Sequence, residues 1–320
     1  MKVILTGASG FLGKNLLLRV PDSWEVFGLF NSSGDFEDFV KKECDRNIIP
    51  FRCDLRKASQ VKKLKSKIGK KIDLVLYFAA NTNPAYSVEQ PIFDLDSNVS
   101  ALINFFENFT SKKTIYLSSL AVYGGAEGLV TAKSNLVPTL PYGISKLAAE
   151  QYIKFYHSIK KRISNYVILR FFGAYGPYEP PQKIFTKLIN TFFINKKDRF
   201  KVRGNGNNNL DVMYIEDAVR GIMNIVNRDG TNGVFNFGTG RPVTINELVK
   251  CVANLCGVKD PVILHEGKTY EYTKFYMNPK DIRTNFSFKP EISLTDGVRK
   301  FATFLMEHQK VAQIKSRTLR

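Results

Sequence analysis

The turn that follows the first apolar segment constrains the fold of this chain more than any other feature. Residues 1–13 read MKVILTGASGFLG, so three apolar residues are followed by Gly7, Gly10 and Gly13, with two residues between successive glycines. Leu12, Leu16 and Leu17 then have helical spacing. Glycine in a strand–turn–helix segment lets a pyrophosphate approach the backbone N–H groups that open the helix. The segment therefore predicts a dinucleotide site.

A phosphate-binding loop of the nucleoside-triphosphatase type does not fit this turn. Five residues separate Gly7 from Gly13, where that motif has four, and Asn15 stands where a magnesium-binding Ser or Thr belongs. An ordinary loop without a ligand remains the alternative interpretation.

Composition limits the class of protein. The chain has 320 residues, of which 44% are hydrophobic, and no apolar run near the roughly 18 residues that span a membrane. Its first apolar segment is too short for a signal peptide, so we expect a soluble, cytoplasmic protein with no membrane partner. Four cysteines without a CxxC pair, and only three histidines, predict reduced thiols and no metal site.

The formal net charge of +18 predicts attraction to anions. Much of the excess lies in residues 56–71, which resemble a solvated helix face, and in residues 310–320. We find no nucleic-acid-binding motif, so we expect no nucleic-acid partner. A phosphate-bearing small substrate fits the charge equally well.

Apolar segments alternate with helical stretches over the first half of the chain. The predicted strands are 2–6, 25–30, 48–51, 73–80, 113–118 and 166–172. This alternation predicts an α/β fold with a parallel sheet. After Gly173 the pattern becomes mixed, which predicts a smaller second lobe. We expect a dinucleotide-binding domain over 1–172 and about 211–240, a substrate lobe over 173–210 and 241–308, and a disordered basic tail over 309–320.

Tyr142 and Lys146 are four residues apart in the helical context PYGISKLAAE, so their side chains share one face. A lysine ammonium there would lower the pKa of the phenol toward the range of a useful base. The same spacing also occurs elsewhere, for example at Tyr156 and Lys160. Tyr142 is distinguished by the preceding strand, which ends in Ser118 and Ser119. For Ser118 a backbone-capping role is the alternative.

These motifs together resemble the extended short-chain dehydrogenase/reductases, the NAD-dependent epimerase/dehydratase family of nucleotide-sugar enzymes. The resemblance covers residues 1 to about 305. It rests on TGASGFLG (6–13), CDLRK (53–57), YFAA (77–80), SSLAVYG (118–124), YGISK (142–146), LRFFGAYGP (169–177), DVMYIEDAV (211–219) and FNFGTG (235–240). It implies a Rossmann-type doubly wound parallel sheet with a smaller C-terminal substrate lobe.

The resemblance also implies roles for individual residues. Ser119, Tyr142 and Lys146 would be catalytic, with Tyr142 as the base and Lys146 holding the nicotinamide ribose. Asp54 would contact the adenine, and Asn98 would brace the strand ends unless it is only a helix cap. The full set of implied cofactor contacts is Gly7, Ser9, Gly10, Phe11, Leu12, Gly13, Asn31, Asp54, Leu55, Phe78, Ala79, Ala80, Asn98, Tyr142, Lys146 and Phe172. The candidate substrate contacts are Thr82, Ser119, Tyr142, Gly173, Lys183 and Arg203.

Three departures from the family pattern bear on function. Asn31 occupies the place of an acidic residue that binds the ribose 2′-hydroxyl, and we expect no arginine to adjoin it, so the cofactor is NAD or NADP. Leu210 replaces an arginine that binds the substrate phosphate in many relatives. Leu120 and Ala121 stand where dehydratases and decarboxylases carry an acid, which disfavours elimination.

We therefore expect an NAD(P)-dependent epimerase that acts on a nucleoside-diphosphate sugar through a keto intermediate. An NADPH-dependent nucleotide-sugar 4-ketoreductase is the alternative, and a non-catalytic dinucleotide- or RNA-binding relative is a more distant one. The resemblance also implies a homodimer formed by two helices, for which segments 97–109 and 143–160 are candidates. Leu102, Phe105, Phe106, Ala149, Tyr152 and Tyr156 could serve that interface or the internal core.

Overall fold

A seven-stranded parallel sheet forms the centre of the computed structural model, which describes residues 1–269 and 273–318, with side chains as far as His308. The strand order is β12-β7-β5-β4-β1-β2-β3, and every neighbouring pair is parallel. The strands are β1 (Lys2–Thr6), β2 (Glu25–Phe30), β3 (Ile48–Arg52), β4 (Lys71–Tyr77), β5 (Thr110–Ser119), β7 (Ile163–Phe171) and β12 (Gly233–Phe237). The predicted α/β fold with a doubly wound parallel sheet is confirmed.

The strand order reverses between β1 and β4, which are adjacent although two other strands separate them in the sequence. Val75 and Leu76 of β4 are fully buried, as expected for a strand that helices cover on both sides. The apolar run that we expected over 73–80 ends as a strand at Tyr77. Residues 78–80 instead form the loop at the carboxyl edge of the sheet.

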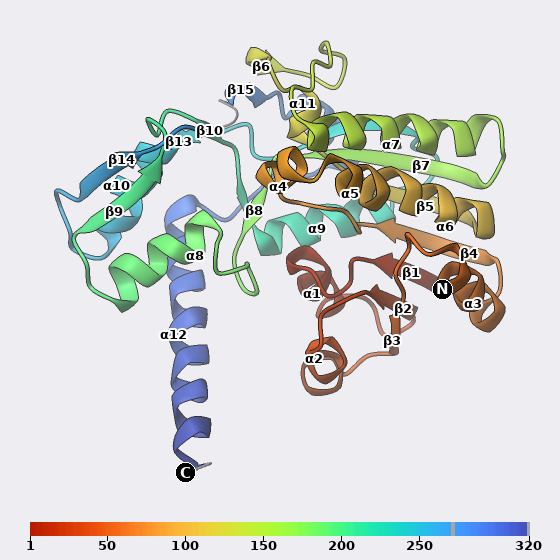
Figure 1. The fold of residues 1–320 in the computed structure, drawn as a ribbon, viewed down its shortest axis with the longest axis horizontal. Coiled ribbons are helices and arrows are strands. Elements are labelled where there is room, and N and C mark those ends of the chain that lie inside the picture. The colour runs from red at the N-terminus through yellow and green to blue at the C-terminus, as the bar shows by residue number, and fades with distance from the viewer. Residues whose placement is uncertain (270–272, 319–320) are drawn as a thin grey trace.

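Helices cover both faces of the sheet (Figure 1). One face carries α1 (Phe11–Leu17), α2 (Phe36–Glu43) and α9 (Ile215–Val226), whose apolar residues share one buried cluster. The other face carries α3 (Ala58–Ile68), α6 (Ala101–Asn108) and α7 (Pro141–Ser158), which share a second cluster. Short elements connect these layers: α4 (Pro84–Glu89), α5 (Pro91–Leu95), the π-helix η1 (Asp96–Ser100), the 3-10 helix η2 (Leu120–Val122) and β6 (Glu127–Val130).

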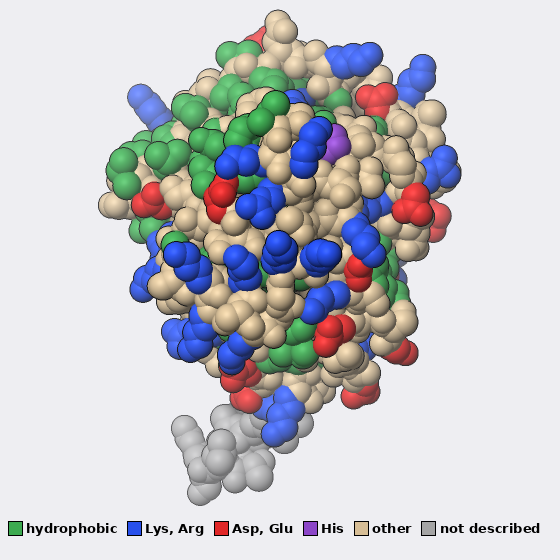
Figure 2. All heavy atoms as spheres, turned by 90° about the vertical axis from the view of Figure 1, so that its right-hand side faces the viewer, with side chains coloured by type: hydrophobic (Ala, Val, Ile, Leu, Met, Phe, Trp, Pro, Cys, Tyr) green, Lys and Arg blue, Asp and Glu red, His purple; other side chains and the backbone are tan. Residues whose placement is uncertain are grey.

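The basic segment 56–71 contains the amphipathic helix α3. Val61, Leu64 and Ile68 are buried, whereas Lys62, Lys63 and Lys67 are exposed. On the corresponding face of the molecule, Lys and Arg side chains outnumber Asp and Glu side chains (Figure 2). The helix thus has the solvated lysine face that its sequence predicts.

The candidate dimer residues on α6 and α7 divide between the core and the surface. Leu102, Phe105, Phe106 and Ala149 are fully buried, and Tyr156 is 1% exposed. These five residues pack in the cluster against the sheet. Tyr152 is 37% exposed and is therefore the one member of the predicted set that is available to a partner.

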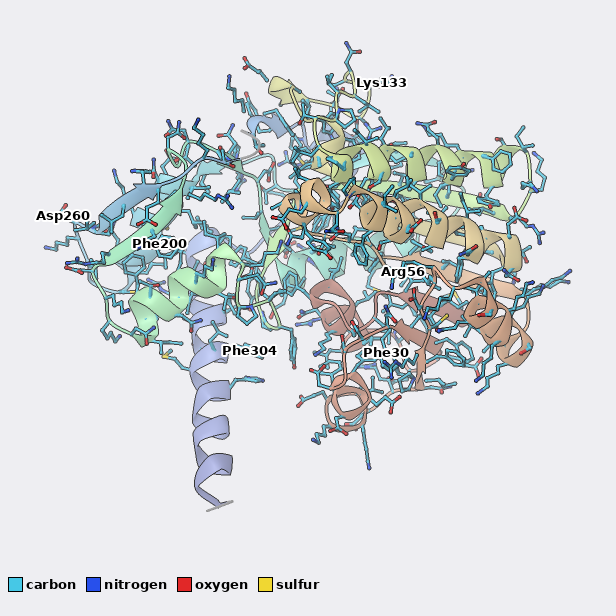
Figure 3. All side chains as sticks on the ribbon, in the orientation of Figure 1. Phe30, Arg56, Lys133, Phe200, Asp260 and Phe304 are labelled. Carbon is cyan, nitrogen blue, oxygen red and sulfur yellow. The ribbon has the colours of Figure 1, made fainter. Side chains whose placement is uncertain are left out.

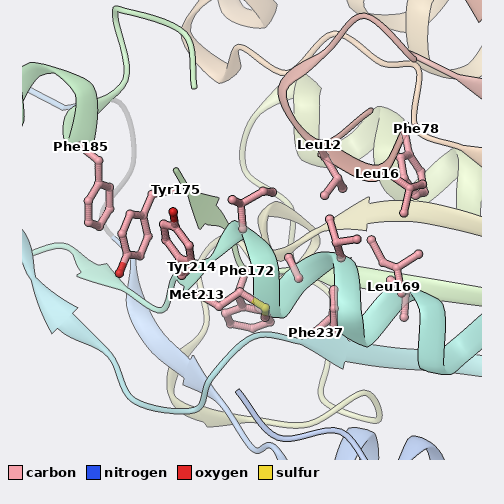
Figure 4. Close-up of a cluster of buried hydrophobic side chains, with 14 of the residues drawn as sticks. Leu12, Leu16, Phe78, Leu169, Phe172, Tyr175, Phe185, Met213, Tyr214 and Phe237 are labelled. Carbon is pink, nitrogen blue, oxygen red and sulfur yellow. The ribbon is translucent and has the colours of Figure 1, made fainter. Parts of the chain in front are cut away.

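The remaining elements form the second lobe, in which the strands pair only in twos. These elements are β8 (Ala174–Tyr175), α8 (Ile184–Ile189), η3 (Asn190–Ile194), β9 (Arg199–Arg203), β10 (Asn209–Leu210), β11 (Met213–Tyr214), β13 (Val243–Thr244), α10 (Ile245–Leu255), β14 (Val262–Glu266), β15 (Lys274–Met277), α11 (Lys280–Phe286) and α12 (Leu294–Thr318). Side chains of Tyr175 and Phe185 continue the apolar cluster that begins with Leu12 and Leu16 (Figure 4). The lobe therefore shares a core with the sheet, and the exact domain boundaries stay a prediction.

The structure differs from the predicted disordered tail over 309–320. Helix α12 continues to Thr318, and residues 319–320 lie outside the described part of the chain. Residues 309–318 contain no proline or glycine, and Ala, Gln, Lys and Arg are good helix formers, so the helix has no local reason to stop at 308. Figure 3 shows Phe304 on the part of this helix that lies against the body of the molecule.

Candidate active site

The glycine-rich turn between β1 and α1 packs against the end of β4. Gly7 has a φ of +69°, and a Cβ there would lie 2.9 Å from the backbone nitrogen of Ala79. A Cβ on Gly13 would lie 2.5 Å from the carbonyl oxygen of Gly7. The Thr6 hydroxyl accepts hydrogen bonds of 3.0 Å from the backbone N–H groups of Phe78 and Ala79. The turn is thus held where the strand order reverses, the position at which such sheets bind their ligands.

The other residues of this turn have distinct surroundings. The Gly10 N–H donates to the carbonyl of Gly7 at 3.0 Å, and Gly10 begins α1 without a side-chain cap. Leu12 is buried in the core, whereas Phe11 is half-buried. The first N–H groups of the helix have no side-chain acceptor at the cap, as a phosphate-binding turn requires. The cradle therefore fits the pyrophosphate of a dinucleotide.

At the edge formed by β2 and β3, the structure corrects the expectation that no arginine adjoins Asn31. Asn31 directly follows β2 and is exposed. Arg52 at the end of β3 donates from its Nε to the carbonyl oxygen of Asn31 at 2.9 Å. An arginine therefore does adjoin Asn31, because the parallel pairing of β2 with β3 brings together residues that are 21 positions apart. Ser33 donates to Ser9 of the glycine-rich turn at 2.9 Å.

Asp54 lies beyond β3, where the resemblance places the adenine. Its carboxylate accepts hydrogen bonds of 2.9 Å from both Nε and an NH₂ group of Arg56. This pairing with Arg56 lowers the pKa of Asp54. Leu55 is buried in the cluster beneath. Figure 3 shows Arg56 at this side of the sheet, and contact of Asp54 with adenine stays a prediction.

Asn98 belongs to a buried polar network rather than to a simple helix cap. Its Oδ1 accepts from the N–H of Asn81 at 2.7 Å, and its Nδ2 donates to Ser145 Oγ at 2.8 Å and to Asp94 at 3.2 Å. The Ser145 hydroxyl also donates to Asp94 at 2.5 Å. Ser145 precedes Lys146 on α7, so the network ties the loop after β4 to the helix that carries Tyr142 and Lys146.

Sequence reasoning missed Asp94, although a signal was present. Asp94 and Asn98 are four residues apart, a spacing that brings two side chains together on a helix. Asp94 is fully buried, and its neighbours supply hydrogen-bond donors to both carboxylate oxygens. A buried acid needs such partners, so this residue holds the loop and the helix in a fixed relation.

Ser119 and Tyr142 meet at the carboxyl edge of the sheet. Ser119 is the last residue of β5 and caps η2 by accepting from the N–H of Ala121 at 3.2 Å. Tyr142 lies in the first turn of α7, and its N–H donates to Ser87 Oγ at 3.1 Å. Burial raises the pKa of Tyr142 above its usual value, while a side-chain hydrogen bond with Ser119 acts in the opposite direction.

Lys146 differs in detail from the sequence-based prediction. Its Nζ donates to the carbonyl of Leu117 and lies 4.7 Å from the centre of the Tyr116 ring. Burial lowers the pKa of Lys146 to about 7, while the charges of Glu150 and Asp94 oppose that shift. We expected Lys146 to lower the pKa of Tyr142, but Lys146 Nζ is directed toward β5, and Ser119 is the side chain that opposes the rise in this pKa caused by burial.

A buried ion pair lies behind these residues. Glu150, four residues after Lys146 on α7, accepts from Arg170 Nε at 3.0 Å and from an Arg170 NH₂ group at 2.8 Å. Ser118 donates to Glu150 at 2.6 Å, so it does not cap the backbone. Arg170 also donates to the Tyr123 hydroxyl at 3.0 Å. This cluster joins α7, β5 and β7, and sequence reasoning did not identify it.

Phe172 and Gly173 lie at the predicted boundary between the sheet and the second lobe. Phe172 is 4% exposed, and its ring contacts those of Tyr123 and Phe275. Gly173 has a φ of +133°, and a Cβ there would lie 2.9 Å from Val212 Cγ1. Gly173 therefore serves close packing of the chain.

The other candidate substrate contacts are more dispersed. Thr82 is exposed in the loop after β4. Lys183 is the exposed residue before α8, and Arg203 at the end of β9 donates to the carbonyl of Lys268 at 2.9 Å. Leu210 pairs with Val243 between β10 and β13. The described contacts do not connect these residues with Ser119 or Tyr142, and their substrate roles stay predictions.

A model of the NAD dependent epimerase/dehydratase family matches residues 3–238, a range that contains the glycine-rich turn, Ser119, Tyr142 and Lys146. The chain belongs to this family. Its members are enzymes that act on nucleotide sugars.

Individual relatives have low sequence identity to this chain, but the similarity covers nearly its whole length. The UDP-glucose 4-epimerase of Mycolicibacterium smegmatis is 25% identical over 95% of this chain and 98% of its own length. A crystal structure of UDP-glucose 4-epimerase with UDP-glucose from Thermotoga maritima superimposes with a TM-score of 0.85 at 22% identity, over 97% of this chain and all of that one. The structure of MoeE5 with UDP-glucose and NAD gives a TM-score of 0.82 at 25% identity, over 97% and 100% of the two chains.

The part of the chain that the structure describes offers neither a membrane-spanning helix nor a metal-binding cluster. No helix there is both long and apolar enough to cross a membrane. No group of three or more His, Cys, Asp and Glu side chains in the same part of the chain has the geometry to hold a metal ion.

Proposed function

We propose that this protein is a nucleotide-sugar epimerase that inverts one sugar carbinol through a keto intermediate. The observation that carries the proposal is the hydrogen-bonded pair of Ser119 and Tyr142, which lies at the carboxyl edge of the sheet that also holds the glycine-rich turn. The substrate is a nucleoside-diphosphate sugar, a class supported by the UDP-glucose bound in the relative MoeE5.

Each residue of the pair has a role in proton transfer. Tyr142 accepts the proton of the reacting sugar hydroxyl. It returns this proton after the keto sugar has rotated and presents the opposite face of its keto group to the cofactor. Ser119 orients the reacting oxygen and stabilises the phenolate by its hydrogen bond. Lys146, buried beneath them, holds the cofactor's ribose. NAD(P), bound at the glycine-rich turn, supplies the hydride acceptor for this chemistry.

The surroundings of the pair favour hydride transfer over elimination. The two residues after Ser119 are Leu120 and Ala121, and neither carries a proton-shuttling group. The fully buried acids that the structure describes are Asp94 and Glu150, and each is held by several hydrogen-bond donors. Elimination requires an additional acid or base at a neighbouring carbon.

The test is an assay of the purified protein with UDP- and dTDP-sugars, in which the sugar products are separated and nicotinamide absorbance is followed. We expect interconversion of two epimers without net change in absorbance. Tyr142→Phe removes the proton acceptor and should reduce the rate by about 10²–10⁴-fold. Tyr166→Phe, a half-buried tyrosine on β7, is the matched control. Equal rates in wild type and Tyr142→Phe would exclude this mechanism.

An NADPH-dependent 4-ketoreductase is the second candidate, and the exposed Asn31 with its neighbour Arg52 favours it. That edge carries a cation where an enzyme that retains NAD carries an acid. A 4-keto sugar nucleotide added with NADPH distinguishes the two functions. Stoichiometric loss of nicotinamide absorbance supports the reductase, whereas an unchanged absorbance with epimer formation supports the epimerase.

We further propose that the protein forms a homodimer through α5 and α7, which pack side by side. Ile92, Leu95 and Ile144 are 70%, 46% and 54% exposed, and Tyr152 lies on the same helix as Ile144. Apolar side chains exposed together on neighbouring helices favour association with a second copy. Sedimentation at micromolar concentration should give twice the chain mass, and a monomer would exclude the dimer.

A further inference from the structure

Asp94 is a buried carboxylate that is bound only by uncharged donors. It lies on the short helix α5 and is fully buried. Its Oδ1 accepts from Asn81 Nδ2 at 2.7 Å and from Asn98 Nδ2 at 3.2 Å, and its Oδ2 accepts from Ser145 Oγ at 2.5 Å. Among the described residues, no Lys or Arg forms an ion pair with it. A buried charge is costly unless the surrounding groups compensate it, so the position of Asp94 calls for an explanation beyond packing.

Ser145 links Asp94 to the turn of α7 that carries the catalytic residues. The Ser145 side chain is buried, and its hydroxyl contacts the backbone carbonyl oxygen of Tyr142 at 3.1 Å as well as the carboxylate of Asp94. Ser145 also directly precedes Lys146 in the sequence. One side chain therefore connects the buried carboxylate with the backbone of both Tyr142 and Lys146.

The same turn is held from the other side by α4. The Tyr142 N–H donates to Ser87 Oγ at 3.1 Å, and the Ser87 hydroxyl donates to the carbonyl oxygen of Pro84 at 2.6 Å. Helices α4 and α5 both pack against α7 (Figure 1). The N–H and the carbonyl group of Tyr142 are thus each fixed by a buried serine. A reacting group needs such fixed geometry, because a displacement of about 1 Å can cost about 10²-fold in rate.

The charged and titratable groups around Lys146 come from the three elements β5, α5 and α7. On α7 itself, the charge of Glu150 is already paired with Arg170 of β7. On β5, the Tyr116 ring lies 4.7 Å from Lys146 Nζ, and burial raises the pKa of Tyr116, so this phenol stays neutral. Asp94 on α5 is the remaining acid whose negative charge favours the ammonium form of Lys146.

We propose that Asp94 is a positioning residue for the reaction: it fixes the turn that carries Tyr142 through Ser145, and its carboxylate is the counter-charge of the Lys146 ammonium. The inference rests on the proposed function, in which Tyr142 transfers the proton and Lys146 holds the cofactor. Asp94 is fully buried and has three donors, so it does not touch the substrate. Its charge favours the ammonium and opposes the phenolate, so its removal should lower the pKa of both Lys146 and Tyr142.

The experiment combines an NMR titration with steady-state kinetics. Lysine labelled with ¹³C at Cε reports the pKa of Lys146 in the protein without substrate, after any dinucleotide that co-purifies has been removed. The absence of its signal in Lys146→Met assigns it. Asp94→Asn keeps the shape of the side chain and removes the charge. Asp96→Asn, the matched control, removes the same charge from a half-buried acid whose charge acts on Arg56.

We expect Asp94→Asn to lower the pKa of Lys146, about 7 in the wild type, by about one pH unit, and Asp96→Asn to leave it unchanged. Asp94→Asn should also reduce kcat by about tenfold or more with little change in KM, because the carboxylate does not touch the substrate. The pH profile of kcat should move as a whole to lower pH, since Tyr142 and Lys146 both titrate lower. A loss of packing alone would lower the profile without moving it.

A second variant separates the position of the turn from the charge. Ser145→Ala keeps the carboxylate of Asp94 but breaks its link to the carbonyl group of Tyr142. We expect kcat to fall while the pH profile stays in place. Because this variant removes one hydroxyl, it also tests the link if Asp94→Asn does not fold.

An unchanged titration of Lys146 in Asp94→Asn, or an equal change in Asp96→Asn, would overturn the role of the counter-charge. A wild-type kcat in Ser145→Ala would overturn the link to Tyr142. The NMR titration requires no sugar nucleotide. A wild-type protein that converts no sugar nucleotide would therefore exclude the proposed function, while the titration of Lys146 would still decide whether Asp94 supplies its counter-charge.

Discussion

The carboxyl edge of the sheet and the candidate substrate contacts of the second lobe hold their charged groups in opposite ways. Around Tyr142, the acids Asp94 and Glu150 are fully buried, and both are fixed by hydrogen bonds from neighbouring elements. In the second lobe, Lys183 and Arg203 are exposed on short elements. Buried charges must be paired, so they define one geometry, whereas exposed charges are screened and adaptable. The fold therefore holds the acids beside Tyr142 in one geometry, whereas the proposed substrate contacts of the second lobe can adapt.

Breaking the Glu150–Arg170 pair is the strongest test of this contrast. Glu150→Gln leaves the guanidinium buried without its counter-charge, and we expect a loss of about 3–5 kcal/mol in the free energy of unfolding. Chemical denaturation measures that loss. The double variant Glu150→Met with Arg170→Met removes both charges and should recover most of the stability. A single variant as stable as the wild type would show that the pair does not brace the site.

This ion pair marks the limit of what the sequence could predict. The strands, the glycine-rich turn and the positions of Ser119 and Tyr142 follow from local periodicity and motif spacing, and the structure places each at the expected element. Glu150 and Arg170 lie 20 residues apart on α7 and β7. Their contact depends on how the helix docks against the sheet, and no local pattern reports that packing.

The same dependence on tertiary packing explains why the expectations for Asn31 and for Lys146 had to be corrected. Arg52 and Asn31 become neighbours through the register of β2 and β3, which pairs Phe30 with Arg52. Lys146 has the helical spacing from Tyr142 that we expected, yet its Nζ turns toward Leu117. The spacing of two residues along a helix determines whether their side chains lie on the same face. The hydrogen-bond partner of each side chain depends on the burial and the acceptors that the fold provides.

The pH dependence of stability should distinguish the two regions by its sign. Burial lowers the pKa of Lys146 to about 7 and raises the pKa of Glu179, just before α8, also to about 7. Between pH 7 and about 10.5 the unfolded chain binds the lysine proton that the folded chain releases, so stability rises with pH. Between about pH 4.5 and 7 the folded chain keeps the proton of Glu179, so stability falls as pH rises.

Two variants separate these contributions. Lys146→Met should remove the rise above pH 7, and Glu179→Gln, which still accepts from Thr186, should remove the fall below pH 7. The free energy of unfolding of each variant, measured against the wild type from pH 4.5 to 10, reports the difference. Parallel curves for a variant and the wild type would mean that the corresponding group titrates alike in the folded and unfolded chains.

The smallest effect is expected in the second lobe. Arg203→Gln should change the free energy of unfolding by no more than about 0.5 kcal/mol, because the side chain is exposed. If Arg203 contacts the phosphate of the nucleotide sugar, its loss raises KM by less than about tenfold and leaves kcat unchanged, because a screened contact acts equally on substrate and transition state. Steady-state kinetics of this variant and of the control Arg199→Gln, on the same strand, measure KM and kcat. A fall in kcat instead would place Arg203 in the chemical step and would erase the contrast between a rigid site of chemistry and an adaptable site of recognition.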